Sequence, residues 1–186
     1  MSKPTTATAT CPDSRTPPSE EPPSFLADCM LGRLARWLRI LGYDTVYFRQ
    51  ITDKELLAYH HGSGRILLTR DTALSRSPEL GAYLFIRDDN WQAQLRQVLE
   101  TLDLTVVLTR MFTLCADCNQ ALQVLRPAEV HGKVPDFVAA TQKEFRGCAS
   151  CGRIYWPGSH RRHVLKVLKG IASLEGDEMV NPGGAA

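Results

Sequence analysis

Two cysteine pairs with the same internal spacing limit the folds open to this chain of 186 residues. They are Cys115-Ala-Asp-Cys118 and Cys148-Ala-Ser-Cys151. Each pair can turn back so that both sulfurs face one point, and four thiolates form a closed tetrahedral zinc site. Two redox-active dithiols would need a strand-helix context that is missing here, and unmetallated core cysteines have no reason to repeat a spacing. The pattern therefore predicts a structural zinc ion bound by all four cysteines.

The segment between the pairs has 29 residues, which is more than compact zinc motifs usually enclose. This length suits a small zinc ribbon with a long pair of middle strands. The other two cysteines, Cys11 and Cys29, have no obvious disulfide partner, which favours a reducing compartment. The N-terminus has no apolar signal core, and no apolar run approaches the ~18 residues that a membrane span needs. We therefore expect a cytoplasmic protein that contacts no membrane.

The composition is that of an ordinary globular protein, with 44% hydrophobic and 23% charged residues. The formal net charge is only +2, but it is uneven: residues 111–175 carry 9 basic and 5 acidic side chains. These values exclude a histone-like polycation. Any contact with nucleic acid must come from local basic patches. The oligomeric state cannot be deduced from these numbers.

Apolar runs and helical patterns alternate along residues 25–110. We expect strands at 25–27, 45–48, 65–69 and 82–86, with helices at 31–41, 52–61 and 91–102 between and after them. Gly42 is expected to end the first helix. Such alternation predicts the α/β class, with a parallel sheet flanked by helices and a small C-terminal zinc ribbon.

The expected domain organisation follows from these patterns. It consists of a disordered leader (1–24), an α/β domain (25–110), the zinc ribbon (111–163), a C-terminal helix (164–175) and a disordered tail (176–186).

Acidic residues follow directly after several of the predicted strands. Asp28, Asp71 and the pair Asp88-Asp89 occupy such positions, and Glu55 lies on the helix after the second strand. The carboxyl ends of parallel strands share one edge, so these side chains should converge in one cleft. Clustered carboxylates need a cation, and Mg²⁺ or Mn²⁺ bound there suits phosphodiester hydrolysis.

Each acid also has a structural interpretation. Asp28, Asp71 and Asp88 precede helices, where Asp is a favoured N-cap, and Thr52-Asp-Lys-Glu55 fits a capping box. Three separate strand ends carrying Asp are more than capping requires, because Ser, Thr or Asn would serve as well. The joint pattern favours the catalytic interpretation.

Basic side chains offer candidate phosphate contacts. Arg33, Arg36 and Arg39 recur every three residues of one predicted helix, and they form either a solvated face or a phosphate-binding stripe. Arg70 could contact the scissile phosphate or cap the sheet edge. Beyond the cysteines, Tyr155 and Trp156 precede His160-Arg-Arg-His163; these aromatics either stack on RNA or pack the ribbon core.

Several of these segments resemble one known family. They are residues 25–44, Asp53-Lys-Glu55-Leu-Leu, Arg65-Ile-Leu-Leu-Thr-Arg-Asp71, both cysteine pairs, and the run from Cys151 to His160. In this order, over about residues 25–163, the chain resembles the Mut7-C RNase domain family, which is regarded as a PIN-like nuclease fold fused to a zinc ribbon. The resemblance implies metal-dependent cleavage of RNA, with PIN-type acids at Asp28, Glu55, Asp71 and Asp88 or Asp89. The chain has Asp28-Cys29 where the family usually has Asp-Gly or a similar pair.

The leading hypothesis is therefore a metal-dependent endoribonuclease. Asp28, Asp71 and Asp88 or Asp89 would hold one or two Mg²⁺ or Mn²⁺ ions, with Glu55 as a further ligand or a base. Arg33, Arg36, Arg39 and Arg70 would bind the RNA backbone. The competing hypothesis is a non-catalytic RNA- or ribosome-binding adaptor, in which the zinc ribbon binds and the acids are caps. A third possibility, which the sequence leaves open, is that a protein partner regulates the cleavage of RNA.

Overall fold

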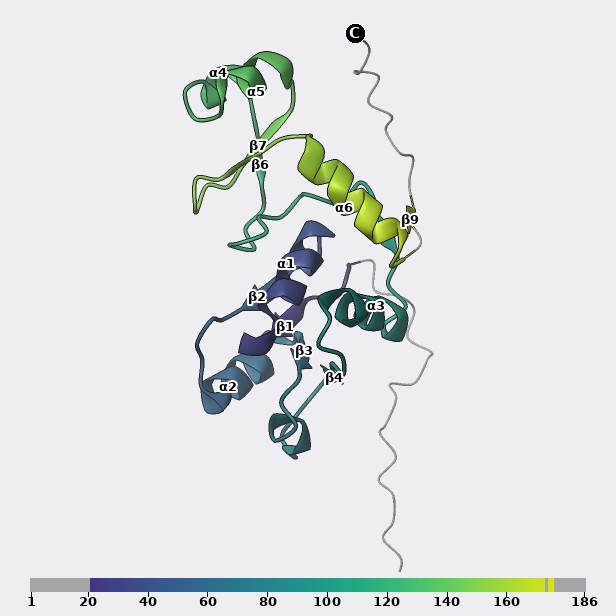
Figure 1. Cartoon of the computed structure of the whole chain (residues 1–186). Coiled ribbons are helices and arrows are strands. Elements are labelled where there is room, and N and C mark those ends of the chain that lie inside the picture. Colours follow the sequence, from purple (N-terminus) through teal and green to yellow (C-terminus); the bar gives the residue numbers. More distant parts are fainter. Residues whose placement is uncertain (1–20, 173, 176–186) are drawn as a thin grey trace, which may run out of the picture.

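In the computed structural model of the chain, residues 21–172 and 174–175 are described (Figure 1). The leader predicted for residues 1–24 therefore falls on described structure only at 21–24, and the tail predicted for 176–186 lies outside it. Within the described part, no helix combines the length and the apolar character that crossing a membrane requires.

The first part of the chain alternates strands and helices. Its elements are β1 (Phe25–Ala27), the 3-10 helix η1 (Cys29–Leu31), α1 (Gly32–Ile40), β2 (Thr45–Tyr47), α2 (Asp53–Ser63), β3 (Ile66–Thr69), the 3-10 helix η2 (Leu74–Arg76), β4 (Tyr83–Phe85) and α3 (Trp91–Thr101). The four strands pair in parallel in the order β2-β1-β3-β4. The predicted α/β class with a parallel sheet and flanking helices is confirmed.

The two faces of the sheet bury different cores. Successive residues of a strand point to opposite faces. Phe25 and Ala27 therefore join a large core with α1 and α3, while Leu26 joins a smaller core with Leu56 of α2 and Leu74 of η2. In Figure 1, α1 and α3 lie on one side of the strands and α2 on the other. Helices on both faces explain why these strands read as continuous apolar runs.

The zinc-ribbon segment forms a three-stranded antiparallel sheet in the order β6-β7-β8. Its elements are β6 (Gln123–Leu125), α4 (Pro127–Val130), α5 (Asp136–Thr141), β7 (Phe145–Gly147) and β8 (Ile154–Tyr155). The expected long pair of middle strands is wrong, because β6 and β7 have only three residues each and the chain between them forms the short helices α4 and α5. Pro127 at the first helical position and the capping contacts of Glu129 to Arg126 favour the helical turn there. A small core of Val130, Val134 and Phe145 holds this part together.

Residues at both ends of the ribbon segment pack in the core of the sheet domain. Met111 and Ala116 belong to the large core, as do Val164 and Leu168 of α6 (Ser159–Lys169). The helix begins at Ser159, five residues before the predicted start. Beyond it, β9 (Leu174–Glu175) pairs in parallel with β5 (Val106–Val107). The large core therefore includes residues on both sides of the boundary predicted between 110 and 111.

The end of α1 depends on a glycine. Gly42 has a φ of +89°, a conformation that L side chains rarely adopt, and its N–H donates to the Arg39 carbonyl over 3.0 Å. A Cβ added at this position would also meet the carbonyl oxygen of Arg110 at less than normal contact distance. Both the conformation and the close approach therefore require glycine.

Substituting Gly42→Ala should lower the free energy of unfolding by about 2 kcal/mol or more, because the methyl group adds a clash to an unfavourable φ. Gly64→Ala is the matched control: Gly64 ends α2 with a φ of +64°, but nothing lies within 4 Å of an added Cβ. That variant should lose only about 1 kcal/mol. Urea unfolding of both variants measures the difference, and equal losses would contradict the packing argument.

Candidate functional site

The candidate acids Asp28 and Asp71 lie at the carboxyl edge of the parallel sheet, as expected. Asp28 follows β1, and Asp71 follows β3, the neighbouring strand. The chain leaves β1 toward β2 on one side and leaves β3 toward β4 on the other. The two acids therefore border the point where the winding direction reverses, which is the usual ligand-binding position of open α/β sheets.

Hydrogen bonds fix the carboxylate of Asp28. Only 4% of the residue is exposed. Its Oδ1 accepts the Met30 N–H at 2.8 Å, and its Oδ2 accepts the Thr69 hydroxyl at 2.6 Å and the Arg70 N–H at 2.8 Å. A carboxylate has about four acceptor positions, so about one is left after these three bonds. Asp28 is thus both the cap of η1 and an oriented ligand candidate.

Thr69 connects the two acids. Its side chain is fully buried; the hydroxyl donates to Asp28 and accepts the N–H of Asp71 at 3.0 Å. Its only sequence signal is weak: Thr69 is the first polar residue after the apolar run of β3.

A small pocket of about 40 Å³ opens beside these residues. Its lining includes three carboxylates, those of Asp28, Asp53 and Asp71, and its other residues are Cys29, Met30, Ile51, Leu56 and Leu74. The Oδ1 of Asp71 accepts the N–H groups of Ala73 and Leu74 at 2.6 and 3.2 Å, which orients this acid at the pocket. The pocket joins residues from the ends of β1 and β3 with the start of α2.

Glu55 does not line this pocket, whereas Asp53 does. The Glu55 carboxylate turns back to accept the Thr52 N–H at 3.0 Å and the Thr52 hydroxyl at 2.7 Å, so the capping box forms as the sequence allowed. These hydrogen bonds, from the Thr52 side chain first and its backbone second, lower the pKa of Glu55. The signal for Asp53 was available: a capping box commits its fourth residue to the cap and leaves the acid at the first helical position unused.

Asp88 and Asp89 have separate environments outside the pocket. The Oδ1 of Asp88 accepts the Asn90 N–H at 2.7 Å, in the turn that leads into α3. Asp89 forms an ion pair with the guanidinium of Arg70, whose side chain is 22% exposed. Across the described residues, the one group of three or more His, Cys, Asp or Glu side chains close enough to hold a metal ion is a different one, the four cysteines.

The cysteine site has the geometry of a four-thiolate zinc centre. The Sγ atoms of Cys115, Cys118, Cys148 and Cys151 lie within 4.8 Å of one another. The Sγ atoms of Cys115 and Cys151 are 3.7 Å apart, close to the ~3.8 Å edge of a tetrahedron with Zn–S bonds of about 2.3 Å. The donor set and its spacing fit a closed structural zinc site, and the four cysteines could hold the ion that the sequence predicted.

Nearby donors prepare one of these thiols for ionisation. Burial opposes ionisation of Cys115, but hydrogen bonds from the Tyr155 hydroxyl and from the N–H groups of Cys118 and Asp117 lower its pKa to about 7. The Tyr155 oxygen lies 3.2 Å from the Cys115 sulfur. Tyr155 is therefore part of the cysteine site, where such contacts orient metal ligands.

Arg39 attaches the first cysteine pair to the sheet domain. Its side chain is buried; Nε donates to the Thr45 carbonyl at 2.8 Å, and Nη1 donates to the carbonyls of Ala116 and Asp117 at 3.2 and 2.8 Å. Burial lowers the pKa of this guanidinium, an effect that Cys115 and Asp117 oppose. The expectation that Arg39 contacts RNA is contradicted by this placement, because its donors are used inside the protein.

Asn119 completes this attachment. It has a φ of +63°, which Asn tolerates better than most residues. Its side-chain oxygen accepts the N–H of Thr45 at 2.9 Å, at the start of the outermost strand β2. Its amide nitrogen donates to Asp44. The loop that carries Cys115 and Cys118 is therefore bonded to the edge of the parallel sheet.

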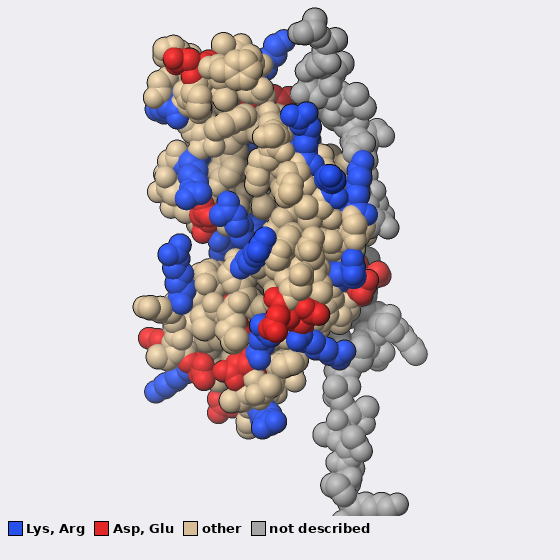
Figure 2. Space-filling view, in the orientation of Figure 1, with Lys and Arg blue, Asp and Glu red and all other residues tan. Residues whose placement is uncertain are grey.

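The other two arginines of α1 have distinct contacts. The Arg36 guanidinium lies 2.8 Å from Asp117, which also pairs with Arg153, and the Arg36 side chain is 46% exposed. The Arg33 guanidinium sits 4.7 Å from the centre of the Trp91 ring, which itself stacks on Trp37. Figure 2 shows basic side chains around the junction of the ribbon and the sheet domain, with acidic ones concentrated lower on the same face.

A comparison with known protein families shows to which family the chain belongs. The sequence model described as Mut7-C RNAse domain matches residues 23–168. The chain belongs to the Mut7-C RNAse domain family. The match includes the acidic pocket, all four cysteines and nearly all of α6, so the resemblance seen in the sequence is confirmed. Neither the curated proteins nor the solved structures provide a match.

For this Mut7-C domain, removal of metal should loosen the ribbon before the parallel sheet. The loop of Cys115 and Cys118 stays bonded to the sheet domain through Arg39 and Asn119, whereas Cys148 and Cys151 lie beside the ribbon strands β7 and β8. We expect one zinc ion per chain at pH 7 and, after chelation, faster hydrogen exchange at 145–155 than at 25–69. Cys151→Ser should lose the zinc, whereas Cys29→Ser, at an exposed cysteine outside the cluster, should keep it. Zinc retained by Cys151→Ser at wild-type affinity would contradict a four-thiolate centre.

Loss of the Arg39 side chain should also destabilise the domain. Arg39→Ala leaves two buried carbonyls and one partly buried carbonyl without this donor, and we expect a loss of about 3 kcal/mol or more in the free energy of unfolding. Arg36→Ala, one turn earlier on the same helix, removes a half-exposed ion pair and should cost about 0–1 kcal/mol. Thermal or urea unfolding distinguishes them; a larger loss for Arg36→Ala would refute the structural role of Arg39.

Proposed function

We propose that this chain is a metal-dependent endoribonuclease whose active site is the pocket formed by Asp28, Asp53 and Asp71. The observation that carries the proposal is that three acidic residues line one pocket where the winding of the parallel sheet reverses, in a member of an RNAse domain family. Family membership points to RNA as the substrate, and the acidic pocket offers a site for phosphodiester chemistry.

The pocket suits a hard divalent cation. Its three carboxylates supply oxygen donors, the ligands that Mg²⁺ and Mn²⁺ prefer, and a small site leaves such an ion several of its waters. The oxygens of Asp28, Asp53 and Asp71 are not gathered closely enough to form a ready-made cluster, so one or two of these acids would bind the ion directly and the others through its waters. A cation bound there would lower the pKa of a water and stabilise charge on the phosphate. Asp28 is the rigid ligand of this set, while the more exposed Asp53 and Asp71 can adjust to the ion.

Arg70 is the residue that we assign to the scissile phosphate. Its backbone N–H binds Asp28 at the pocket, while its guanidinium pairs with Asp89 outside the pocket, so contact with a bound phosphate would require the guanidinium to exchange Asp89 for the phosphate. A guanidinium can form two parallel hydrogen bonds with a phosphate, which fixes the orientation of the group. In this proposal Asp89 positions Arg70 and Asp88 shapes the turn before α3. We also propose that the parallel sheet with its flanking helices is a PIN-like nuclease fold.

Cleavage of single-stranded RNA in Mn²⁺ or Mg²⁺ tests the proposal. Asp71→Asn and Asp53→Asn should each reduce the cleavage rate by about 100-fold or more, because each removes a charged ligand from the pocket. Glu100→Gln, at an exposed position of α3 away from the pocket, is the charge-matched control and should cleave like the wild type. The metal-free arm uses buffer without divalent ions, since a chelator would also remove zinc. Undiminished cleavage by the double variant Asp53→Asn/Asp71→Asn would overturn the assignment.

Asp28 is a less selective probe than the other two acids. Both of its oxygens accept hydrogen bonds, so an asparagine would turn its NH₂ group toward a donor. We expect Asp28→Asn to lose both cleavage and about 1–3 kcal/mol of stability. A loss of cleavage in Asp28→Asn therefore supports a catalytic role only if a measured unfolding curve shows that the variant is still folded under the assay conditions.

A second candidate function is a non-catalytic RNA- or ribosome-binding adaptor. The observation in its favour is that the acids have structural partners: Asp28 caps η1, Glu55 completes a capping box, and Asp71 and Asp88 accept N–H groups of their turns. If the chain is an adaptor, the wild type and Asp53→Asn/Asp71→Asn should bind RNA with equal affinity. Neither protein should cleave RNA in the presence of Mg²⁺ or Mn²⁺. That combination of results would replace the nuclease proposal.

A further inference from the structure

Helix α6 carries basic side chains and no acidic one along its whole length, Ser159–Lys169. Its exposed residues include His160, Arg162, His163, Lys166 and Lys169. On the opposite side, Val164 and Leu168 are buried in the large core with residues of α1 and α3. The helix is therefore held firmly by one face and presents a charged face to solvent. We call Arg162, Lys166 and Lys169, which lie together on the side of the helix opposite the buried residues, the basic α6 face.

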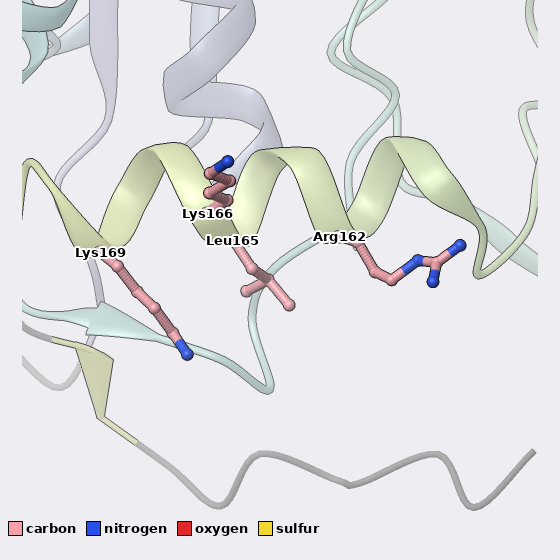
Figure 3. Close-up of a pocket in the computed structure, with 4 residues that line it drawn as sticks. All are labelled: Arg162, Leu165, Lys166 and Lys169. Atoms are coloured by element: carbon pink, nitrogen blue, oxygen red, sulfur yellow. The ribbon is translucent and has the colours of Figure 1, made fainter. Parts of the chain in front are cut away.

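The basic α6 face borders a shallow hollow of about 270 Å³. Its lining consists of Arg162, Leu165, Lys166 and Lys169. Figure 3 shows the side chains of Arg162 and Lys169 extending on the same side of the helix as Leu165, one toward each end. Arg162 and Lys169 are seven residues apart, which is about 10 Å along a helix. Cationic groups spaced along a rigid, open surface match the repeated charge of an extended polyanion.

An aromatic side chain lies next to the first turn of α6. Trp156 is 36% exposed, and its indole nitrogen lies 3.4 Å from where a Cβ on Gly158 would be, just before the helix begins. An exposed ring beside cationic side chains is the combination that binds unpaired bases and their phosphates. Tyr155, the other aromatic candidate, is committed to the Cys115 sulfur.

A membrane surface is the other polyanion that basic amphipathic helices bind. Such binding requires the apolar stripe of the helix to enter the lipid boundary. In α6 this stripe includes Val164 and Leu168, which are 1% and 0% exposed because they pack in the protein core. The stripe is therefore unavailable to lipid, and nucleic acid is the partner that fits the charge.

We propose that the basic α6 face, with Trp156 at its start, binds the backbone of single-stranded RNA apart from the acidic pocket. The inference rests on the proposed function in taking RNA as the substrate. In Figure 1, α6 lies across α1 and α3 from the sheet, and no residue of the basic face lines the acidic pocket. The face therefore contributes affinity for the substrate and takes no part in the cleavage step.

Fluorescence anisotropy with a labelled single-stranded RNA, in buffer without Mg²⁺ or Mn²⁺, tests this surface. Arg162→Gln/Lys166→Gln should weaken binding by about 10-fold at low salt and reduce the salt-dependence slope by about 1.4, corresponding to two phosphate contacts. Lys133→Gln/Lys143→Gln removes the same charge from exposed positions of the ribbon and should change affinity less than about 2-fold. Thermal unfolding of both double variants checks that the fold is retained.

The outcomes separate this inference from the nuclease proposal. Weaker binding by Arg162→Gln/Lys166→Gln with cleavage by the wild type supports both, and weaker binding without any cleavage supports the surface alone. Wild-type affinity in Arg162→Gln/Lys166→Gln, or an equal loss in the ribbon control, overturns the surface even where the wild type cleaves. A wild-type chain that binds no RNA overturns both proposals.

Discussion

The three hydrogen bonds of the buried Arg39 guanidinium are the interaction on which the arrangement of the two parts depends. They join the end of α1, the first residue of β2 and the loop of the first cysteine pair. Because this loop is fixed to the sheet domain, a zinc ion bound by all four cysteines would connect the ribbon to the sheet domain as well as close the ribbon itself. Arg39 thus has an architectural role.

In the proposed active site, Asp28 would serve folding and chemistry together. Asp28 orients η1 and binds both Thr69 and Arg70, so the carboxyl ends of β1 and β3 are tied through its side chain. The same bonds remove its freedom to rotate, which is what a metal ligand or catalytic acid requires. Capping and catalysis are therefore compatible roles for Asp28. A single side chain at a strand end can satisfy the helix that follows it and still present an acceptor to the pocket.

The sequence was sufficient for the sheet and the cysteine cluster, because apolar runs, helical periodicity and a repeated spacing are local signals. It was insufficient where a side chain's direction decides its role. Each step of three residues along a helix rotates the side chain by about 60°, so Arg33 and Arg39 lie about 120° apart and have different surroundings. Arg33, Arg36 and Arg39 face an aromatic ring, an aspartate and the protein interior. Likewise Asp53 and Glu55 are neighbours in sequence, but the capping box turns only Glu55 away from the pocket.

The contact between Asn119 and the start of β2 has a consequence for solubility. β2 is the outermost strand of the parallel sheet on its side, and the loop of the first cysteine pair covers its beginning. An uncovered edge strand offers its backbone groups to another chain, which is a common route to aggregation. Because the Asn119 side chain already occupies the N–H of Thr45, this end of the edge strand is closed to a second chain, and loss of Asn119 would open it to self-association.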